Sequence, residues 1–353
     1  MRSSVVVTIL ASCALACGVV GGERAERTAS LEQPIINGAT SGTEQDFVVQ
    51  LGLEFGGTVY PSCSGTMVAK NLVLTARHCV GELQDDVTVI DFEPSQLHVF
   101  AGADAPARVA SGARADARGK LLFTAKTKDL VPDVALVLLD KALTTPIAPI
   151  RLEGGAKKNE LLDIIGFGIT ETNERPEARM QRKSVRVLAI GPALTLHHQL
   201  FEGEFVFGEA ACSGDSGGPA VSSTTKAVVG VASRVSNGEE RTEEDPSGFC
   251  LGANAEDVYS ALEPVKDVID EAFAVAGAKP ILEVEEEPAP PDAGPSQPVP
   301  QSEPPPEPAP VITRTTPTTS GCASTPRGSR NANVLGLAAL LGLATFIRRA
   351  RRA

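Results

Sequence analysis

The sequence predicts an all-β domain over residues 35–279, with a targeting segment before it and a stalk and a short hydrophobic tail after it. Short runs rich in β-branched residues recur through this region, and clusters of Gly, Pro, Asn and Asp separate them. Short strands at regular intervals with turn residues between them are typical of a sandwich or a barrel. With 279 − 34 = 245 residues, the region is long enough to bury a full core, as one domain or as two fused barrels.

The elements follow one another in chain order. The clearest strands are expected at 47–53, 72–75, 134–139, 164–167, 185–190 and 228–232. A helical pattern occurs only near the end, over 259–275, where apolar residues recur every three or four positions. Its apolar face would consist of Leu262, Val265, Val268, Ile269 and Phe273.

The first 17 residues have the three parts of a secretory signal peptide: a positive charge at Arg2, an apolar stretch at 5–10 and small residues at 14–16. The apolar stretch is too short to span a bilayer. Cys13 and Cys17 each end a sequence similar to a bacterial lipobox, in which the cysteine is lipidated after cleavage. Lipidation at one of them and plain secretion after cleavage behind residue 16 both remain open.

A proline-rich linker is expected over residues 280–321. Fourteen of the 26 prolines lie between positions 280 and 326, interleaved with Glu, Ser and Thr. Such a stretch cannot bury enough apolar surface to offset its ordering entropy, so we expect an extended, polyproline-like stalk.

The tail, residues 322–353, has three parts: Cys322 after a glycine, an apolar run at 334–347 and four arginines near the end. It resembles the C-terminal sorting signal of myxobacterial surface proteins (MYXO-CTERM). The resemblance implies that a sorting protease removes the tail and that the protein is anchored at the surface, through Cys322. The alternative is a plain C-terminal membrane anchor, for which a 14-residue apolar run is short.

The charge is acidic, with 32 Lys and Arg against 44 Asp and Glu, a net charge of −12. The first 34 residues carry no net charge. The net charge of −6 on the linker cancels the net charge of +6 on the tail. The whole excess therefore belongs to residues 35–279, which hold 22 basic and 34 acidic residues. Because phosphate binding needs clustered positive charge, this balance argues against a nucleic-acid partner.

The strongest chemical signal is Ser216, within the run Gly-Asp-Ser-Gly-Gly at 214–218. Glycines beside a serine allow close approach of a substrate and let backbone N–H groups converge on one point. The run also matches the Gly-x-Ser-x-Gly elbow of α/β-hydrolases, but that fold needs a histidine after the serine. All four histidines precede the serine, at positions 78, 98, 197 and 198. The elbow interpretation therefore fails.

The other known order of a serine triad is histidine, aspartate, serine. His78 lies in Leu-Thr-Ala-Arg-His-Cys at 74–79, and Asp133 begins an apolar run that continues to 139. With Ser216, these motifs resemble the trypsin/chymotrypsin family of serine endopeptidases over about residues 35–275. The resemblance implies two six-stranded antiparallel β-barrels packed together, followed by a C-terminal helix.

The resemblance also implies the roles of the site residues. His78 would be the general base, Asp133 would orient it, and Ser216 would attack a peptide bond of a protein or peptide substrate. The backbone N–H groups of Gly214 and Ser216 would form the oxyanion hole. We expect a monomer that needs no cofactor and no metal ion, and we expect the other three histidines to be surface or hydrogen-bonded core residues. Arg77, beside the base, is expected to face solvent.

Cysteine placement agrees with the same family. Cys63 and Cys79 stand 16 residues apart, and the resemblance pairs them beside the catalytic histidine. It also pairs Cys212 with Cys250 beside the specificity pocket. A secreted chain permits both disulfides. The three remaining cysteines lie in the targeting segments.

The stretch Ile-Ile-Asn-Gly at 35–38 resembles the activated N-terminus of the family. Cleavage before Ile35 would free an amine that pairs with Asp215, a disorder-to-order switch, and residues 18–34 would then be a propeptide. Pro34 stands where the family has Arg or Lys, which argues against self-cleavage and against a trypsin-like activating protease. The alternative is that Ile35 and Ile36 only begin the first strand.

Substrate preference is expected to depend on four positions. Ala210 stands where trypsin-like members place an aspartate, six residues before the nucleophile. Ser233 and Val235 belong to the strand behind the substrate, and valine there narrows the pocket, as in elastase-like members. These features favour small or medium apolar side chains. Asp257 stands where the family has a pocket-wall glycine, so a basic side chain remains possible if this carboxyl group points inward.

The leading hypothesis is a secreted endopeptidase, made as a zymogen and anchored at the cell surface, at a bacterial outer membrane or outside the cell. It would contact the membrane through its tail or a lipid. One alternative is a catalytically inactive trypsin-fold binding module on a surface stalk. Another is a structural surface protein whose stalk is the functional part.

Overall fold

The computed structural model describes residues 35–84, 88–126 and 130–284. The signal peptide at 1–17, the propeptide at 18–34 and the tail at 322–353 lie outside the described residues, as do Cys13, Cys17 and Cys322. Of the linker predicted over 280–321, the structure describes the first five residues.

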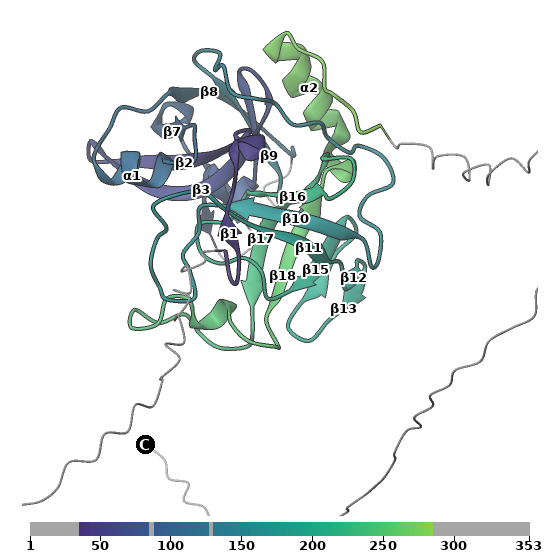
Figure 1. The fold of residues 1–353 in the computed structure, drawn as a ribbon. Helices are drawn as coiled ribbons and strands as arrows, with labels where there is room; N and C mark the ends of the chain where they lie inside the picture. Colours follow the sequence, from purple (N-terminus) through teal and green to yellow (C-terminus); the bar gives the residue numbers. More distant parts are fainter. Residues whose placement is uncertain (1–34, 85–87, 127–129, 285–353) are drawn as a thin grey trace, which may run out of the picture. The chain divides into compact units, whose positions relative to one another are not determined.

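The first half of the domain is a closed barrel of six antiparallel strands, drawn at the upper left of Figure 1. Around the barrel the strands follow the order β2, β3, β4, β9, β8, β7. Alternate side chains of a strand point to opposite faces, so the inward set fills the barrel with Val, Leu and Met. The bounds are β2 (Val48–Phe55), β3 (Thr58–Ala69), β4 (Leu72–Thr75), β7 (Leu97–Phe100), β8 (Ala117–Thr124) and β9 (Ala135–Leu139). The predicted first barrel is confirmed.

The second half is a curled antiparallel sheet of eight strands in the order β1, β11, β10, β16, β17, β18, β15, β12. The two strands at its edges have two residues each, so six longer strands carry the sheet, in agreement with the predicted second set of six. Their bounds are β1 (Ala39–Thr40), β10 (Leu161–Gly166), β11 (Met180–Arg186), β12 (Ala189–Ile190), β15 (Glu204–Gly208), β16 (Pro219–Ser222), β17 (Val228–Ser236) and β18 (Glu256–Ala261).

Smaller elements decorate the two halves. Two-stranded hairpins form from β5 (Gly81–Gln84) with β6 (Thr88–Asp91), and from β13 (Ala193–Leu194) with β14 (Gln199–Leu200). A short helix, α1 (Ala105–Ala110), packs against the first barrel.

The C-terminal helix, α2 (Lys266–Ala276), packs against β4, β8 and β9 of the first barrel. Its buried face of Val268, Ile269, Ala272 and Phe273 belongs to one hydrophobic cluster that includes residues of both halves. It ends at Gly277, which adopts a left-handed conformation with φ 67° and donates its N–H to the last helical carbonyls. The predicted start at 259 is too early, because residues 259–261 belong to β18.

The chain continues from α2 into a packed segment, residues 281–283, which we call the C-terminal clasp. Ile150 donates its N–H to Ile281 O at 2.8 Å, and Glu283 donates to Ile150 O at 2.9 Å. The Glu283 carboxylate pairs with Arg151, whose Nη2 lies 2.7 Å from Oε1, and both side chains are buried. Packed structure therefore extends four residues into the segment expected to be linker.

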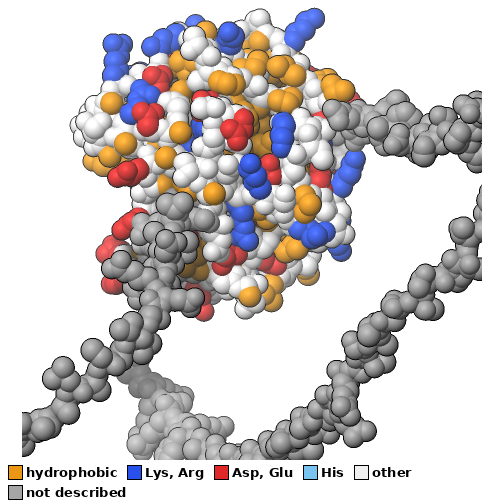
Figure 2. Space-filling view, viewed as in Figure 1, with side chains coloured by type: hydrophobic (Ala, Val, Ile, Leu, Met, Phe, Trp, Pro, Cys, Tyr) orange, Lys and Arg blue, Asp and Glu red, His pale blue; other side chains and the backbone are white. Residues whose placement is uncertain are grey.

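Acidic and basic side chains are interspersed on the face shown in Figure 2, with no single-sign patch over either half. Among the helices of the described residues, none has the length and apolar character needed to cross a membrane.

Candidate active site

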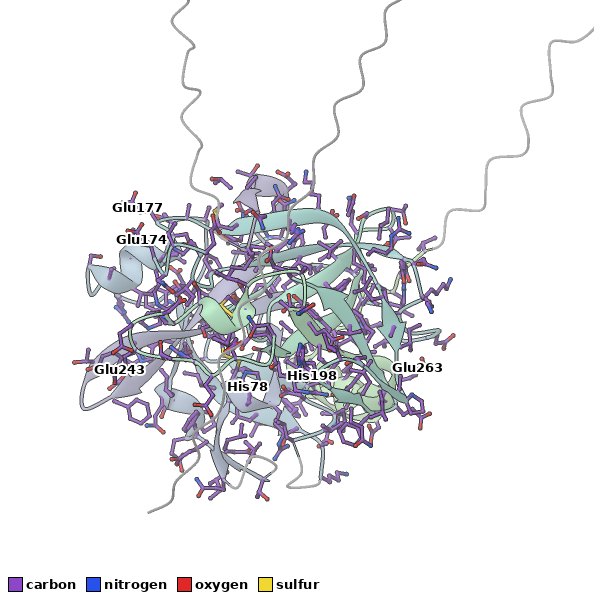
Figure 3. All side chains as sticks on the ribbon, turned by 90° about the horizontal axis from the view of Figure 1, so that it is seen from below. His78, Glu174, Glu177, His198, Glu243 and Glu263 are labelled. Atoms are coloured by element: carbon purple, nitrogen blue, oxygen red, sulfur yellow. A yellow bond between two sulfur atoms is a disulfide. The ribbon has the colours of Figure 1, made fainter. Side chains whose placement is uncertain are left out.

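The predicted triad residues are placed by strand ends that face the junction of the two halves. His78 follows β4 in a short 3₁₀ turn (Arg77–Cys79), and Asp133 lies two residues before β9, the neighbour of β4 in the barrel. Ser216 lies in the loop before β16 of the second half. Ser64 of β3 donates its N–H to Ser216 O at 2.8 Å and so ties this loop to the first barrel. Figure 3 shows His78 on the face that lies below in Figure 1.

His78 and Asp133 form a hydrogen-bonded pair with a defined orientation. Asp133 is fully buried, and its Oδ2 lies 2.8 Å from His78 Nδ1 while its Oδ1 accepts the His78 backbone N–H at 3.0 Å. Ser233 Oγ donates a third hydrogen bond to Oδ2 at 2.6 Å. These contacts fix the imidazole ring with its Nδ1 proton toward Asp133. Nε2, the other ring nitrogen, does not contact Asp133.

The electrostatics of this pair favour its charged form. Burial lowers the pKa of His78, but the charge and hydrogen bond of Asp133 outweigh burial, so the pKa is raised above 6.5. Burial raises the pKa of Asp133. The charge and hydrogen bond of His78 and the hydrogen bond of the Ser233 hydroxyl outweigh burial, so the pKa of Asp133 is lowered. Asp133 is therefore an anion at neutral pH and stabilises a positive charge on His78.

In the loop around Ser216, the backbone N–H groups of Ser213, Gly214 and Ser216 have no hydrogen-bond partner in the part of the chain that the structure describes. The N–H groups of Asp215, Gly217 and Gly218 donate to backbone carbonyls. Within the described residues, those of Gly214 and Ser216 have no such partner. Gly214 adopts φ 103°, which favours glycine, and its carbonyl oxygen is turned away to accept Ser64 Oγ at 2.9 Å. The predicted oxyanion-hole donors are thus free to bond a ligand.

Asp215, next to the proposed nucleophile, is buried with its carboxylate against Gly166 and Gly168. Its carboxylate accepts the N–H groups of Gly168 at 2.7 Å and Cys212 at 3.0 Å. A Cβ on Gly168 would lie within 3.0 Å of both carboxylate oxygens, so this close approach requires glycine. Burial raises the pKa of Asp215 to about 6.

A comparison with family models gives a match to the family described as Trypsin over residues 35–255, which is 221 of the 353 residues. The chain belongs to the trypsin family. Among curated proteins it is similar to hypodermin-B of Hypoderma lineatum, with 26% identity over 253 residues that cover 66% of this chain and 88% of that protein. It is accordingly a trypsin-like serine protease.

Both disulfides implied by the trypsin family are present, Cys63–Cys79 and Cys212–Cys250. Cys63, Cys79 and His78 also form the one close grouping of possible metal ligands within 35–84, 88–126 and 130–284. Both of its sulfurs are bonded to each other, so they cannot serve as thiolate ligands.

His78 and Ser216 are not joined by a hydrogen bond in the described structure. His78 Nε2 lies 3.8 Å from Cys79 Sγ instead. Catalytic hydrogen bonds are often long before substrate binds, so the absence of this bond does not by itself argue against the predicted pair.

Beside Ser216 the trypsin-family domain has a narrow cavity of about 20 Å³. Three of the four positions expected to set substrate preference, Ser233, Val235 and Asp257, line it. Ala210 is buried but does not line it. The remaining lining residues include two that the sequence analysis missed, Ala211 and Tyr259. Tyr259 lies two positions after Asp257 on β18, and this spacing puts both on one face of a strand.

The N-terminal residues of the domain are in its core. Ile35 and Ile36 are fully buried, and Ile35 packs in the same hydrophobic cluster as Ala210 and Ala211. Ile35 has φ 51°, a conformation that β-branched residues rarely adopt. The expected pairing of Ile35 with Asp215 needs a free amine, which the uncleaved chain does not have at this position.

Arg77 differs from expectation. It is buried rather than solvent-facing, with Nη1 3.1 Å from Ala125 O and Nη2 3.4 Å from Asp91 Oδ1. The sequence could not indicate this, because Asp91 ends β6 and Ala125 follows β8, and both come near Arg77 only in the folded chain.

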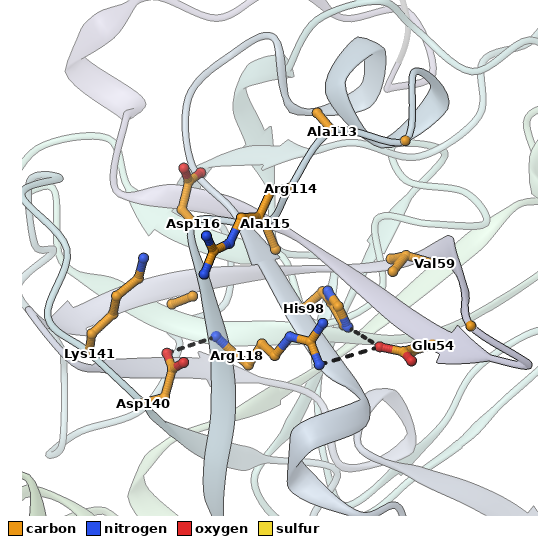
Figure 4. A pocket seen from close by; sticks show the side chains of 13 residues that line it. Glu54, Val59, His98, Ala113, Arg114, Ala115, Asp116, Arg118, Asp140 and Lys141 are labelled. Carbon is orange, nitrogen blue, oxygen red and sulfur yellow. Dashed lines mark hydrogen bonds and ion pairs between the residues drawn. The ribbon is translucent and has the colours of Figure 1, made fainter.

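A second cavity, of about 260 Å³, lies on the first barrel and contains none of the predicted site residues (Figure 4). His98 in its wall is buried and bonds Glu54 Oε2 at 2.7 Å. Arg118 joins the same carboxylate at 3.5 Å, so this histidine has a structural partner.

Proposed function

We propose that the chain is a serine endopeptidase that hydrolyses peptide bonds through a Ser216, His78 and Asp133 triad. The observation that carries this proposal is the hydrogen-bonded side chains of Ser233, Asp133 and His78. It is joined by the unpartnered N–H groups of Gly214 and Ser216. A serine hydroxyl is a weak nucleophile at neutral pH and needs a base that is held in place.

In the first half-reaction Ser216 Oγ attacks the substrate carbonyl carbon while His78 Nε2 accepts the hydroxyl proton. The negative oxygen of the tetrahedral intermediate binds the N–H groups of Gly214 and Ser216. His78 then gives its proton to the leaving amine, and the C–N bond breaks to leave an acyl-enzyme. Water repeats the sequence and releases the acid.

The protein is proposed to be made as a zymogen that is cleaved before Ile35. Two observations support this. Asp215 is a buried carboxyl group without a bonded cation in the described structure, so a new ammonium group beside it would be strongly stabilised. The positive φ of Ile35 exists only while residue 34 is attached, so cleavage releases a backbone strain of about 1–3 kcal/mol.

Secretion and surface anchoring complete the proposal. The two disulfides suit an oxidising compartment outside the cytosol. The signal peptide at 1–17, the linker and the arginine-ended tail come from the sequence alone.

The test is to label the mature protein with a fluorophosphonate and to sequence its N-terminus, with Ser216→Ala as the matched control. We expect one adduct, on Ser216, in protein that begins at Ile35, and no adduct in the variant. Peptidase activity that survives in Ser216→Ala would remove the proposed nucleophile. Absence of labelling in protein that begins at Ile35 would favour the inactive binding module.

A further inference from the structure

Arg175 places its guanidinium group beside the backbone of the loop that holds Asp215. A Cβ atom on Gly214 would lie 3.2 Å from Arg175 Nη1 and 3.0 Å from the Cα atom of Gly168. A Cβ atom on Gly168 would in turn lie 2.3 Å from Asp215 Oδ2. The guanidinium group therefore lies next to two glycines, one of which precedes Asp215 in the sequence while the other contacts its carboxylate.

Hydrogen bonds fix the backbone that carries Arg175. Ile169 donates its N–H to Ser213 O at 2.9 Å, which ties the start of this segment to the loop of the proposed nucleophile. Thr170 then closes a turn, since its N–H bonds Glu174 O at 2.9 Å, and Arg175 is the next residue. The side chain of Arg175 thus starts from a position that the protein holds in place.

A second loop, residues 237–250, supports the same turn. Ser247 donates its N–H to Asn173 Oδ1 at 2.6 Å, and Asn173 Nδ2 donates to Asp245 Oδ1 at 3.1 Å. The second loop ends at Cys250, whose disulfide with Cys212 joins it to the loop of the proposed nucleophile. The turn before Arg175 is therefore braced on two sides by segments that are themselves tied to that loop.

The charges of Arg175 and Asp215 act on each other. Burial lowers the pKa of Arg175, the charge of Asp215 raises it, and the charge of Arg241 on the second loop lowers it again. Burial raises the pKa of Asp215, while two backbone N–H groups and the charge of Arg175 lower it. A positive charge near a buried carboxyl group favours the ionised form of that group. In the uncleaved chain, which has no amine at Ile35, the guanidinium group is a cation that can fill this role.

We propose that Arg175 is a positioning residue that supplies the cation for Asp215 while residue 34 is still attached. This inference rests on the proposed function and adds a residue to it. With Asp215 held as an anion, the loop keeps the N–H groups of Gly214 and Ser216 free in the uncleaved chain. The uncleaved protein therefore has a basal reactivity at Ser216, and the ammonium group of Ile35 takes over from the guanidinium group after cleavage.

The test compares the full chain, with residue 34 attached, with a matched chain released from a fusion partner by a cysteine protease so that it begins at Ile35. The variants are Arg175→Gln, Arg175→Lys and the control Arg241→Gln, which removes the same charge from the second loop. The first measurement is the rate of fluorophosphonate labelling. The second needs no catalysis: urea unfolding of the uncleaved chain at pH 8, with Arg175→Gln and Asp215→Asn combined in a double-mutant cycle.

In the uncleaved chain we expect Arg175→Gln to slow labelling by about threefold or more, and Arg175→Lys to slow it less because it keeps the charge. In the chain that begins at Ile35, the variants should label within about twofold of one another, since the ammonium group supplies the charge. Arg175→Gln should raise the unfolding equilibrium constant by about threefold or more with Asp215 present, and should leave it unchanged in the Asp215→Asn background. Arg241→Gln should not slow labelling of either chain.

Equal slowing by Arg175→Gln in both chains, or an equal effect on unfolding with and without Asp215→Asn, would overturn the proposal. An uncleaved chain that does not label, while the chain that begins at Ile35 does, would overturn it as well. If neither chain labels, the peptidase function itself has failed, and the unfolding cycle still decides whether Arg175 supports Asp215.

Discussion

Asp215 is a single residue whose charge is unfavourable in the uncleaved chain and would become useful after the proposed cleavage. Its pKa of about 6, raised by burial, means that the folded chain holds a proton between pH 3.8 and 6 that the unfolded chain releases. The stability of the uncleaved protein therefore falls as pH rises through this window and stays reduced above it. A shift of about two units corresponds to about 3 kcal/mol.

Asp215→Asn is accordingly expected to stabilise the uncleaved chain at pH 8 by up to about 3 kcal/mol, and to have little effect at pH 3. The same substitution should prevent activation, because Asn cannot pair with the Ile35 ammonium group. Urea unfolding at the two pH values measures the first effect, and fluorophosphonate labelling after cleavage before Ile35 measures the second. Equal stability at pH 8 would mean that the carboxyl group already has a partner in the uncleaved chain.

For single residues, the sequence predicted a role where the residue lies in a motif. His78, Asp133 and Ser216 could be named because each motif has its own local pattern. Tyr259 could not, because its contact with the pocket depends on how β18 pairs with β17. The burial of Arg77 likewise depends on long-range contacts.

Helix α2 shows what an element contributes to the fold. Phe273 is 2% exposed and lies in the cluster that includes residues of both halves. Phe273→Ala is expected to lower the free energy of unfolding by about 3–5 kcal/mol, because it leaves a cavity there. Val275→Ala, at a position 53% exposed on the same helix, is the matched control and should cost under about 1 kcal/mol. Equal effects of the two would show that α2 does not support the junction.

The boundary of this helix explains a limit of sequence interpretation. All but the first residue of β18 are buried, so the strand shows no alternation of apolar and polar residues. A six-residue stretch without regular alternation fits a buried strand and a helix equally well. In the first barrel the sequence indicated β2, β4 and β9, whereas β3, β7 and β8 were not among the expected strands. The closure of that barrel was implied by family resemblance rather than by the pattern itself.

At the scale of the whole molecule, the C-terminal clasp joins the end of the domain to its interior. The Glu283 carboxylate bonds Arg151 and the Thr225 hydroxyl, and the hydrogen bond from Arg151 lowers its pKa. A lowered carboxyl pKa contributes stability above the unfolded value near 4.5, and this contribution is lost as pH falls through the folded value.

Glu283→Gln is therefore expected to lower the free energy of unfolding by about 2 kcal/mol at pH 7 and by much less at pH 3. Thermal and urea unfolding at both pH values provide the measurement. Asp270→Asn is the control, since its partner Lys266 forms an exposed pair with it on α2; such a pair contributes about 0.5 kcal/mol or less. A pH-independent effect of Glu283→Gln would mean that the ion pair is not the source of the stability.

The clasp is also the part of the described domain that tension applied through the C-terminal end of the chain would load first. Its two backbone hydrogen bonds to Ile150 form one short parallel bridge, so both would have to break before the segment came away. The Arg151 pair stands beside them and shares the strain. If the proposed anchoring beyond residue 284 is correct, tension on the chain would load the clasp before it reached α2 and the proposed catalytic residues.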